Sequence, residues 1–173
     1  MTVFGFPITI HRSLLLMLIL AFILFTVIGT LSHEMGHYIL AVLAGYEPHF
    51  GYGYVDWSTD DYSQINTFWD RLITLGGPVQ TMLTGTIGLT YLIQNQKSYS
   101  SAEFLTSYQW FWLFLSLFWL RQPTNFILWI GKYLYNGIPS YRGDEVQLAI
   151  QYNLPLWSII GITGIVGFLV SSY

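Results

Sequence analysis

Residues 33–37, His-Glu-Met-Gly-His, lie inside the most apolar run of the chain and have the form H-E-x-x-H. On a helix, His33 and His37 would share one face, so both imidazoles could bind one metal ion. Glu34 would project about 100° away, where it reaches a water molecule on the metal rather than the metal itself. Imidazole is a good zinc ligand, and zinc lowers the pKa of its water toward ~7. The motif therefore predicts part of a hydrolytic zinc site with Glu34 as its general base.

The pattern is specific for a chain of this composition. The chain contains four histidines, and shuffled sequences of the same composition would contain H-E-x-x-H in only about 0.2% of cases. Ionisable groups are costly in so apolar a run, and three of them within residues 33–37 indicate a function. The alternative is a polar cluster that only holds helices together.

The composition predicts an integral membrane protein. Only 9% of the 173 residues are charged, against about 25% in an average soluble protein, and several apolar runs are long enough to cross a bilayer. The length predicts a single domain over residues 1–173. A net charge of −3 with six basic residues gives no indication of nucleic-acid binding. Because the chain has no cysteine, nitrogen and oxygen atoms must hold any metal.

We expect an all-α polytopic fold with about four transmembrane helices. The apolar segments cover about 13–44, 68–94, 104–135 and 155–170, with a short amphipathic helix from 146 to 152. No small-residue cleavage site follows the first segment, so we expect a retained helix rather than a signal peptide. Alternating glycine and aromatic residues over 46–57 predict a short β-hairpin or an extended loop.

A catalytic zinc site usually has three protein ligands and one open position, so a carboxylate should join the two histidines. Asp144 and Glu145 lie at the end of a segment, 136–145, that cannot be regular helix, and irregular backbone at membrane depth is tolerated where it lines protein or a wet cavity. Asp144 is the preferred third ligand, and Glu145 is its nearest rival. Alternatively, Asp144 only caps the start of the next helix.

The positions of these ligands also constrain the topology. The histidines lie near the end of the first membrane crossing, and the second helix crosses back. Asp144 therefore lies on the same side of the membrane as the histidines only if 104–135 crosses the membrane once. Residues 124–135 are too few to span a membrane alone. We therefore expect one pass kinked at Pro123, or a pass followed by a re-entrant half-helix. Arg121 would then lie near membrane depth and should face a polar cavity or a carboxylate.

Three motifs follow one another over most of the chain. They are His-Glu-Met-Gly-His at 33–37, Gly-Gly-Pro-Val-Gln-Thr at 76–81, and Asn-Gly-Ile-Pro-Ser-Tyr-Arg-Gly-Asp-Glu at 136–145. In this order they resemble the H-E-x-G-H, A/G-G-P-x-x-N and N-x-x-P-x-P-x-x-D-G motifs of the site-2 protease family, which are intramembrane zinc metalloproteases. The asparagine, the first proline and the aspartate of the third motif fall at the family spacing.

The resemblance implies a zinc-dependent intramembrane endopeptidase that cleaves transmembrane or membrane-associated proteins. It implies that Asp144 is the third zinc ligand and that four further residues position the substrate: Asn136, Gly77, Pro78 and Thr81. It also implies that the β-hairpin is associated with the membrane. The protein would be multi-pass in a cytoplasmic-type (inner) membrane, with the zinc site toward the cytosol.

Three positions depart from the family motifs. Thr81 stands in place of an asparagine, Tyr141 in place of the second proline, and Glu145 in place of a glycine. They motivate a second hypothesis, in which the chain is a catalytically inactive, zinc-stabilised membrane module that binds a partner helix.

Overall fold

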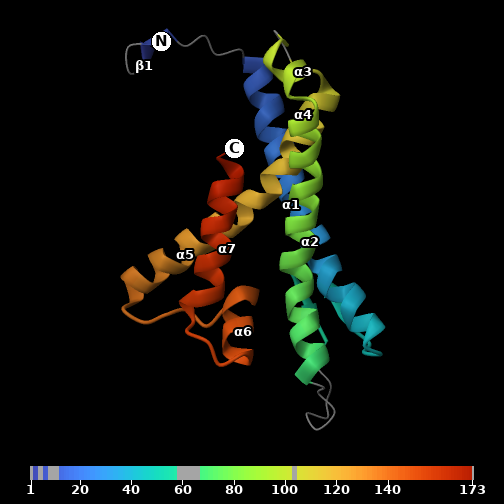
Figure 1. Cartoon of the computed structure of the whole chain (residues 1–173), viewed down its shortest axis with the longest axis vertical. Coiled ribbons are helices and arrows are strands. Elements are labelled where there is room, and N and C mark those ends of the chain that lie inside the picture. Colours follow the sequence, from blue (N-terminus) through green and yellow to red (C-terminus); the bar gives the residue numbers. More distant parts are fainter. Residues whose placement is uncertain (1, 4–5, 8–11, 58–66, 103–104, 173) are drawn as a thin grey trace.

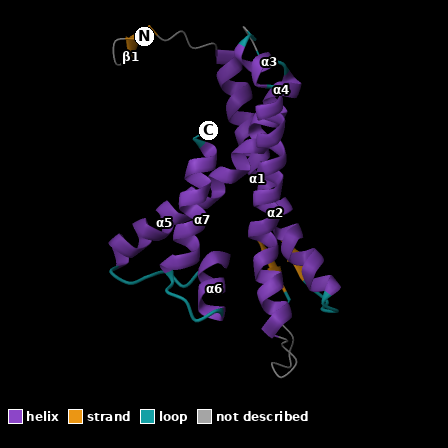
Figure 2. Ribbon diagram, viewed as in Figure 1, coloured by secondary structure: helices purple, strands orange, loops and turns teal. Residues whose placement is uncertain are grey.

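The computed structural model describes residues 2–3, 6–7, 12–57, 67–102 and 105–172. This part of the chain is mostly helical, with two small pairs of antiparallel strands (Figure 2). In chain order the elements are β1 (Thr2–Val3), β2 (Phe6–Pro7), α1 (Arg12–Leu43), β3 (His49–Gly51), β4 (Tyr54–Asp56), α2 (Thr67–Gln94), α3 (Gln96–Ser100), α4 (Ser107–Ser116), the 3₁₀ helix η2 (Leu117–Leu120), α5 (Arg121–Asn136), α6 (Asp144–Gln151) and α7 (Trp157–Ser171).

The helices form two groups that meet along α2. One group contains α1, α2 and α4, which run side by side, and the other contains α5, α6 and α7 (Figure 1). Helix α6 packs against both α2 and α7 and so connects the groups. Fully buried apolar side chains come from α1, α2 and α6, namely Ala41, Ile73, Val146 and Ala149. The apolar core is therefore formed by the same three helices that carry the residues of the predicted site.

Glycines allow α1 and α2 to cross at backbone contact. A Cβ atom on Gly76 would lie 2.5 Å from the carbonyl oxygen of Gly36, so neither position has room for a side chain. Farther along α2, a Cβ on Gly85 would lie 2.6 Å from Cδ1 of Trp119. Close approach at small residues is typical of helix pairs in membranes. The small residues of 76–88 therefore bring α2 against α1 at one end and against α4 and η2 at the other.

The segment 104–135 turns at a 3₁₀ helix rather than at its proline. Helix α4 ends at Ser116, η2 forms one turn, and α5 then leaves the direction of α1 and α2 (Figure 1). Pro123 lies in the first turn of α5, where its missing N–H costs no helical hydrogen bond. It packs on α7, since a Cβ on Gly167 would lie 2.7 Å from its ring. The prediction of a kink at Pro123 is therefore wrong by a few residues.

The predicted irregular segment is shorter than expected. Asp144 and Glu145 form the first turn of α6, so their prediction as irregular backbone is wrong. Gly137 ends α5 with a φ of 71°, and Gly143 precedes α6 with a φ of 106°. Glycine adopts such angles without steric cost, so the helix can start directly after Gly143.

The predicted β-hairpin after the first helix is confirmed. Strands β3 and β4 pair antiparallel, with Phe50 opposite Val55. The ring of Phe50 meets the ring of Tyr38 in α1 edge-on, with centroids 5.8 Å apart, and Val55 is buried. The hairpin therefore folds back onto α1, close to the turn that carries the two histidines.

Within the described ranges, one helix is long and apolar enough to cross a membrane, α1 over Leu15–Leu43. Helix α2 has 28 residues, but threonine, glycine and glutamine interrupt its apolar character. Helix α7 is apolar and has 15 residues, about five fewer than a bilayer core requires. The described residues thus establish a mostly helical fold with one candidate span, which is fewer than the expected four.

Replacing Gly36 by alanine should destabilise the fold by about 1–3 kcal/mol, because the new methyl group would overlap the Gly76 carbonyl and lie 2.8 Å from Cβ of Gln80. Intrinsic helix propensity alone would predict the opposite sign. The matched control is Gly131→Ala in α5, where a Cβ meets nothing within 4 Å. Unfolding of both variants in mixed micelles would measure the difference, and equal stability would contradict the close crossing.

Candidate metal centre

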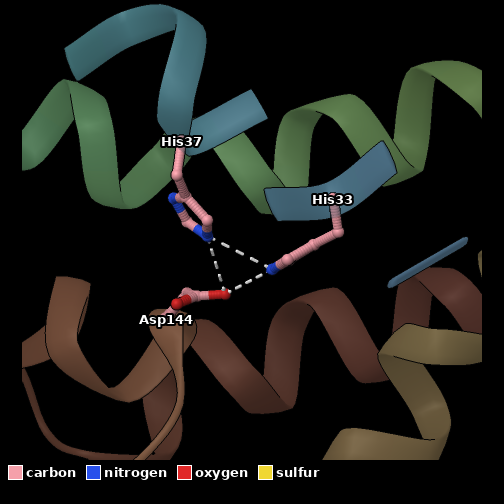
Figure 3. Close-up of side chains that lie close together, drawn as sticks. All are labelled: His33, His37 and Asp144. Carbon is pink, nitrogen blue, oxygen red and sulfur yellow. Dashed lines mark hydrogen bonds and ion pairs between the residues drawn. The ribbon is translucent and has the colours of Figure 1, made fainter. Parts of the chain in front are cut away.

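Three side chains from two distant parts of the chain converge on one point. His33 and His37 of α1 direct their Nε2 atoms at Oδ2 of Asp144, at the start of α6 (Figure 3). Oδ2 lies 2.8 Å from Nε2 of His33 and 3.5 Å from Nε2 of His37, and the two nitrogens are 3.3 Å apart. Both histidines are buried and Asp144 is half-buried. These three residues form a group that could hold a metal ion.

Helix α2 fixes the proton of each imidazole on Nδ1. Nδ1 of His37 lies 2.6 Å from the carbonyl oxygen of Ile73, which can only accept a hydrogen bond. Nδ1 of His33 lies 2.9 Å from the hydroxyl oxygen of Thr81, and that hydroxyl donates its own proton to the carbonyl of Gly77. Both Nδ1 atoms are therefore donors, and both Nε2 atoms are left with bare lone pairs that face a carboxylate oxygen.

Such a cluster of acceptors requires a cation or additional protons between them. Ligands about 2.0–2.1 Å from a tetrahedral ion lie about 3.3 Å from one another, and the separations here are 2.8, 3.3 and 3.5 Å. Gly77 leaves room for the two rings: a Cβ there would lie 2.5 Å from Nε2 of His33 and still nearer to Nε2 of His37. A side chain at this position would therefore displace the two imidazoles.

The carboxyl group of Asp144 is ionised in this environment. Burial alone would raise its pKa, but hydrogen bonds and positive charge from His33 and His37, when their Nε2 atoms also carry protons, hold the pKa well below its usual range. Its alternative role as a helix cap is not realised, because Gly143 occupies the N-cap position of α6 and no side chain caps that end. Asp144 instead presents its carboxylate to α1.

Glu145, the rival for third ligand, is not part of the group. Its side chain is buried and lies near Asn125 of α5. Burial, together with the charge of Asp144, raises the pKa of the Glu145 carboxyl. The helical geometry of α6 separates the two adjacent carboxylates, so one faces the histidines and the other faces α5.

A polar network that the sequence analysis missed connects α6 to α2 and the hairpin. Asp70 accepts hydrogen bonds from Nε1 of Trp57 at 3.1 Å and from the amide of Gln151 at 2.7 Å. Arg71 donates to the backbone oxygen of Gln151 at 2.8 Å, and the ring of Trp57 stacks on His37. Charged residues inside the predicted helix 68–94 were the available signal. Their partners, 13 and 81 positions away, have no spacing that a pattern reveals.

Some of the other predicted site residues lie beside the group of His33, His37 and Asp144, and others do not contact it. Glu34 is buried on the same helical turn as the histidines, and Pro78 is buried in α2 next to Gly77. Thr81 faces His33. Asn136 is the exposed last residue of α5 and forms no hydrogen bond with the metal group. The substrate-positioning roles that the resemblance implies for these residues stay predictions.

Comparison with known proteins finds no match among family models, curated proteins or solved structures. The likeness to site-2 proteases is therefore carried by the three motifs alone. The group that could hold a metal ion does not depend on that likeness, because it is defined by the distances and hydrogen bonds of its own side chains.

The purified protein should bind about one divalent metal ion per chain. Asp144→Asn should weaken metal binding by more than the 10–100-fold that is typical for loss of an outer partner, because it removes the anionic ligand. Glu145→Gln is the matched control and should keep the metal, since Glu145 faces Asn125. Elemental analysis and competition with a chelator would measure both. Equal metal content in wild type and Asp144→Asn would contradict the assignment.

Thr81→Val should weaken metal binding by about tenfold, because His33 would lose the acceptor that keeps its proton on Nδ1. Thr90→Val is a close control on the same helix. Thr90 is exposed, and its hydroxyl donates to the carbonyl four residues earlier, as that of Thr81 does. A chelator titration that gives the same affinity for both variants would show that the contact with His33 is unimportant.

Proposed function

We propose that this protein is a zinc-dependent intramembrane endopeptidase. The observation that carries the proposal is the convergence of two unprotonated imidazole nitrogens and a carboxylate oxygen beside a buried glutamate, Glu34. Two nitrogens and one oxygen, with no cysteine, form a ligand set of the kind found in hydrolytic zinc sites. The three family motifs favour the same activity.

His33, His37 and Asp144 would hold the zinc ion. A bound zinc ion would polarise the scissile carbonyl and make water a stronger acid. Glu34 would take a proton from the attacking water as its oxygen bonds to the carbonyl carbon. It would then deliver that proton to the amine nitrogen as the carbon–nitrogen bond breaks, so the products are a carboxylic acid and an amine. The burial of Glu34 keeps bulk water away from this proton transfer.

We place the protein in a cytoplasmic-type membrane as a multi-pass protein, with α1, α2, the α4–η2–α5 segment and α7 as the four crossing segments. Large apolar side chains are exposed on α1 and α7, including Leu16, Phe22, Phe168 and Leu169. Such surfaces suit lipid better than water. The histidines follow Leu15, the start of the α1 span, by about one bilayer thickness. They would therefore lie near one interface, which the resemblance assigns to the cytosolic side.

The substrate would be a transmembrane or membrane-associated protein. Its helix must be unwound locally before hydrolysis, because helical amides are paired internally. The β3–β4 hairpin lies against the histidine turn through Tyr38 and Trp57. Its strand edge could pair with an unwound substrate segment. This arrangement would bring an extended backbone to the metal group.

One observation favours the alternative, a catalytically inactive zinc-stabilised module that binds a partner helix. Thr81 takes the place of the family asparagine, and its hydroxyl is occupied by His33 and by its own helix. It has no free proton to offer a substrate. In this alternative the metal would only join α6 to α1, and partner binding would not depend on Glu34.

Glu34→Gln should lower the cleavage of a co-reconstituted single-span membrane substrate by about 10²–10⁴-fold while the metal content stays constant, because it removes the base and spares the ligands. Glu47→Gln, in the exposed loop after α1, is the control and should cleave normally. Mass spectrometry of the fragments provides the measurement. Unchanged metal-dependent cleavage in Glu34→Gln would remove the assigned base. Partner binding without cleavage in the wild type would favour the alternative.

A further inference from the structure

A cavity of about 300 Å³ opens beside the metal centre, between α1, η2 and the start of α5. Its walls are mainly apolar, with aromatic rings from Phe22, Phe25, Phe114 and Phe118. Thr81 also lines the cavity, and its hydroxyl oxygen lies 2.9 Å from Nδ1 of His33. The cavity therefore lies behind His33, separated from the metal-facing Nε2 by Thr81 and the imidazole ring.

Arg121 brings a positive charge into this apolar wall. The residue lines the cavity, and its Nε atom is buried without a hydrogen-bond partner. Over the described ranges, ion pairs within 4.0 Å join Asp144 to the two histidines, and none includes Arg121. No carboxylate of the described chain therefore lies within ion-pair distance of the guanidinium, although its charge acts on the buried carboxyl of Glu145 from farther away.

The surroundings make an unpaired charge costly. Arg121 shares the cavity with Phe22 and Gly29, and Gly29 is at the middle of the candidate span Leu15–Leu43. Charged side chains at such depth almost always pair with an opposite charge or face a wet cavity. Glu145 of α6 is buried and feels the charge of Arg121, but the two side chains form no ion pair within 4.0 Å. A carboxylate in direct contact with Arg121 would therefore have to come from what enters the cavity.

We propose that Arg121 is a specificity-determining residue that selects substrates carrying an aspartate or glutamate within an otherwise apolar transmembrane segment. The inference rests on the proposed endopeptidase function and adds its substrate class. The aromatic walls would take the apolar part of the segment, and the guanidinium would bind the carboxylate by charge-assisted hydrogen bonds. The occupant is chosen by charge complementarity, since a neutral segment would leave Arg121 unpaired.

The test measures binding rather than cleavage. The full-length protein with Glu34→Gln, which lacks the assigned base, is reconstituted in phosphatidylcholine vesicles. It is combined with three labelled single-span peptides of leucine and alanine that differ at one central position, which is aspartate, asparagine or lysine. Energy transfer between the labels gives the affinity. The aspartate peptide should bind about tenfold more tightly than the asparagine peptide, as expected when a desolvated charge gains its counter-charge.

Changing Arg121 should change this preference in three defined ways. Arg121→Gln should abolish it, Arg121→Lys should retain part of it, and Arg121→Glu should transfer it to the lysine peptide. Lys132→Gln, on the exposed side of the same helix, is the matched control and should behave as the parent protein. Metal content measured in parallel would show that each variant is folded. If Arg121→Gln binds all peptides weakly, Arg121→Glu still distinguishes the outcomes, because only a direct charge contact would give it a preference for the lysine peptide.

Several outcomes would overturn the inference. Equal affinity for the aspartate and asparagine peptides, or an unchanged preference in Arg121→Glu, would show that Arg121 does not read substrate charge. Loss of the preference on adding phosphatidylglycerol would identify a lipid phosphate as the partner of Arg121 and would likewise reject a substrate carboxylate. The proposed function fails separately: a protein that never cleaves any substrate could still show the carboxylate preference, and an active protease could lack it.

Discussion

The structure depends on the meeting of three electron-pair donors that repel one another unless a positive charge lies between them. The two nitrogens and the oxygen lie within 3.5 Å of one another. Neither imidazole can turn its proton into the gap at no cost, because Ile73 and Thr81 bind that proton on the opposite side of each ring. Neutral histidine with a fixed tautomer is the form that binds metals. The preference for a cation is therefore built by α2, which contributes no ligand itself.

Helix α2 performs this role because it touches every element of the site. Its glycines bring its backbone against α1, so that the carbonyl of Ile73 and the hydroxyl of Thr81 reach the two rings. At its start, Asp70 holds the end of α6 through Gln151. This second contact sets the position of α6, and hence of Asp144, relative to α1. Loss of either contact would misplace a ligand without changing any ligand residue.

Features encoded by local patterns could be predicted from the sequence, and features encoded by pairing between distant segments could not. The first two helices were expected at 13–44 and 68–94 and are observed at Arg12–Leu43 and Thr67–Gln94, because apolar runs, glycine and proline define them locally. The pairing of His33 with His37 followed from helical spacing, whereas ligand chemistry left Asp144 and Glu145 open and the resemblance implied Asp144. The bond between Asp70 and Gln151 and the direction of α5 depend on tertiary packing, which no short pattern records. The count of four spans stays a prediction, because α2 is interrupted by polar residues and α7 has only 15 residues.

The sequence distance between the ligands has a further consequence. His33 and Asp144 are 111 positions apart, so an ion that binds both closes a loop over most of the chain. Closing a long loop lowers the conformational entropy of the unfolded chain, and the gain grows slowly with loop length. A protein with no cysteine cannot obtain this effect from a disulfide. In this molecule a bound ion would act as a disulfide bond does in secreted domains. Removing the ion would lower the stability of the fold as well as remove the function of the site.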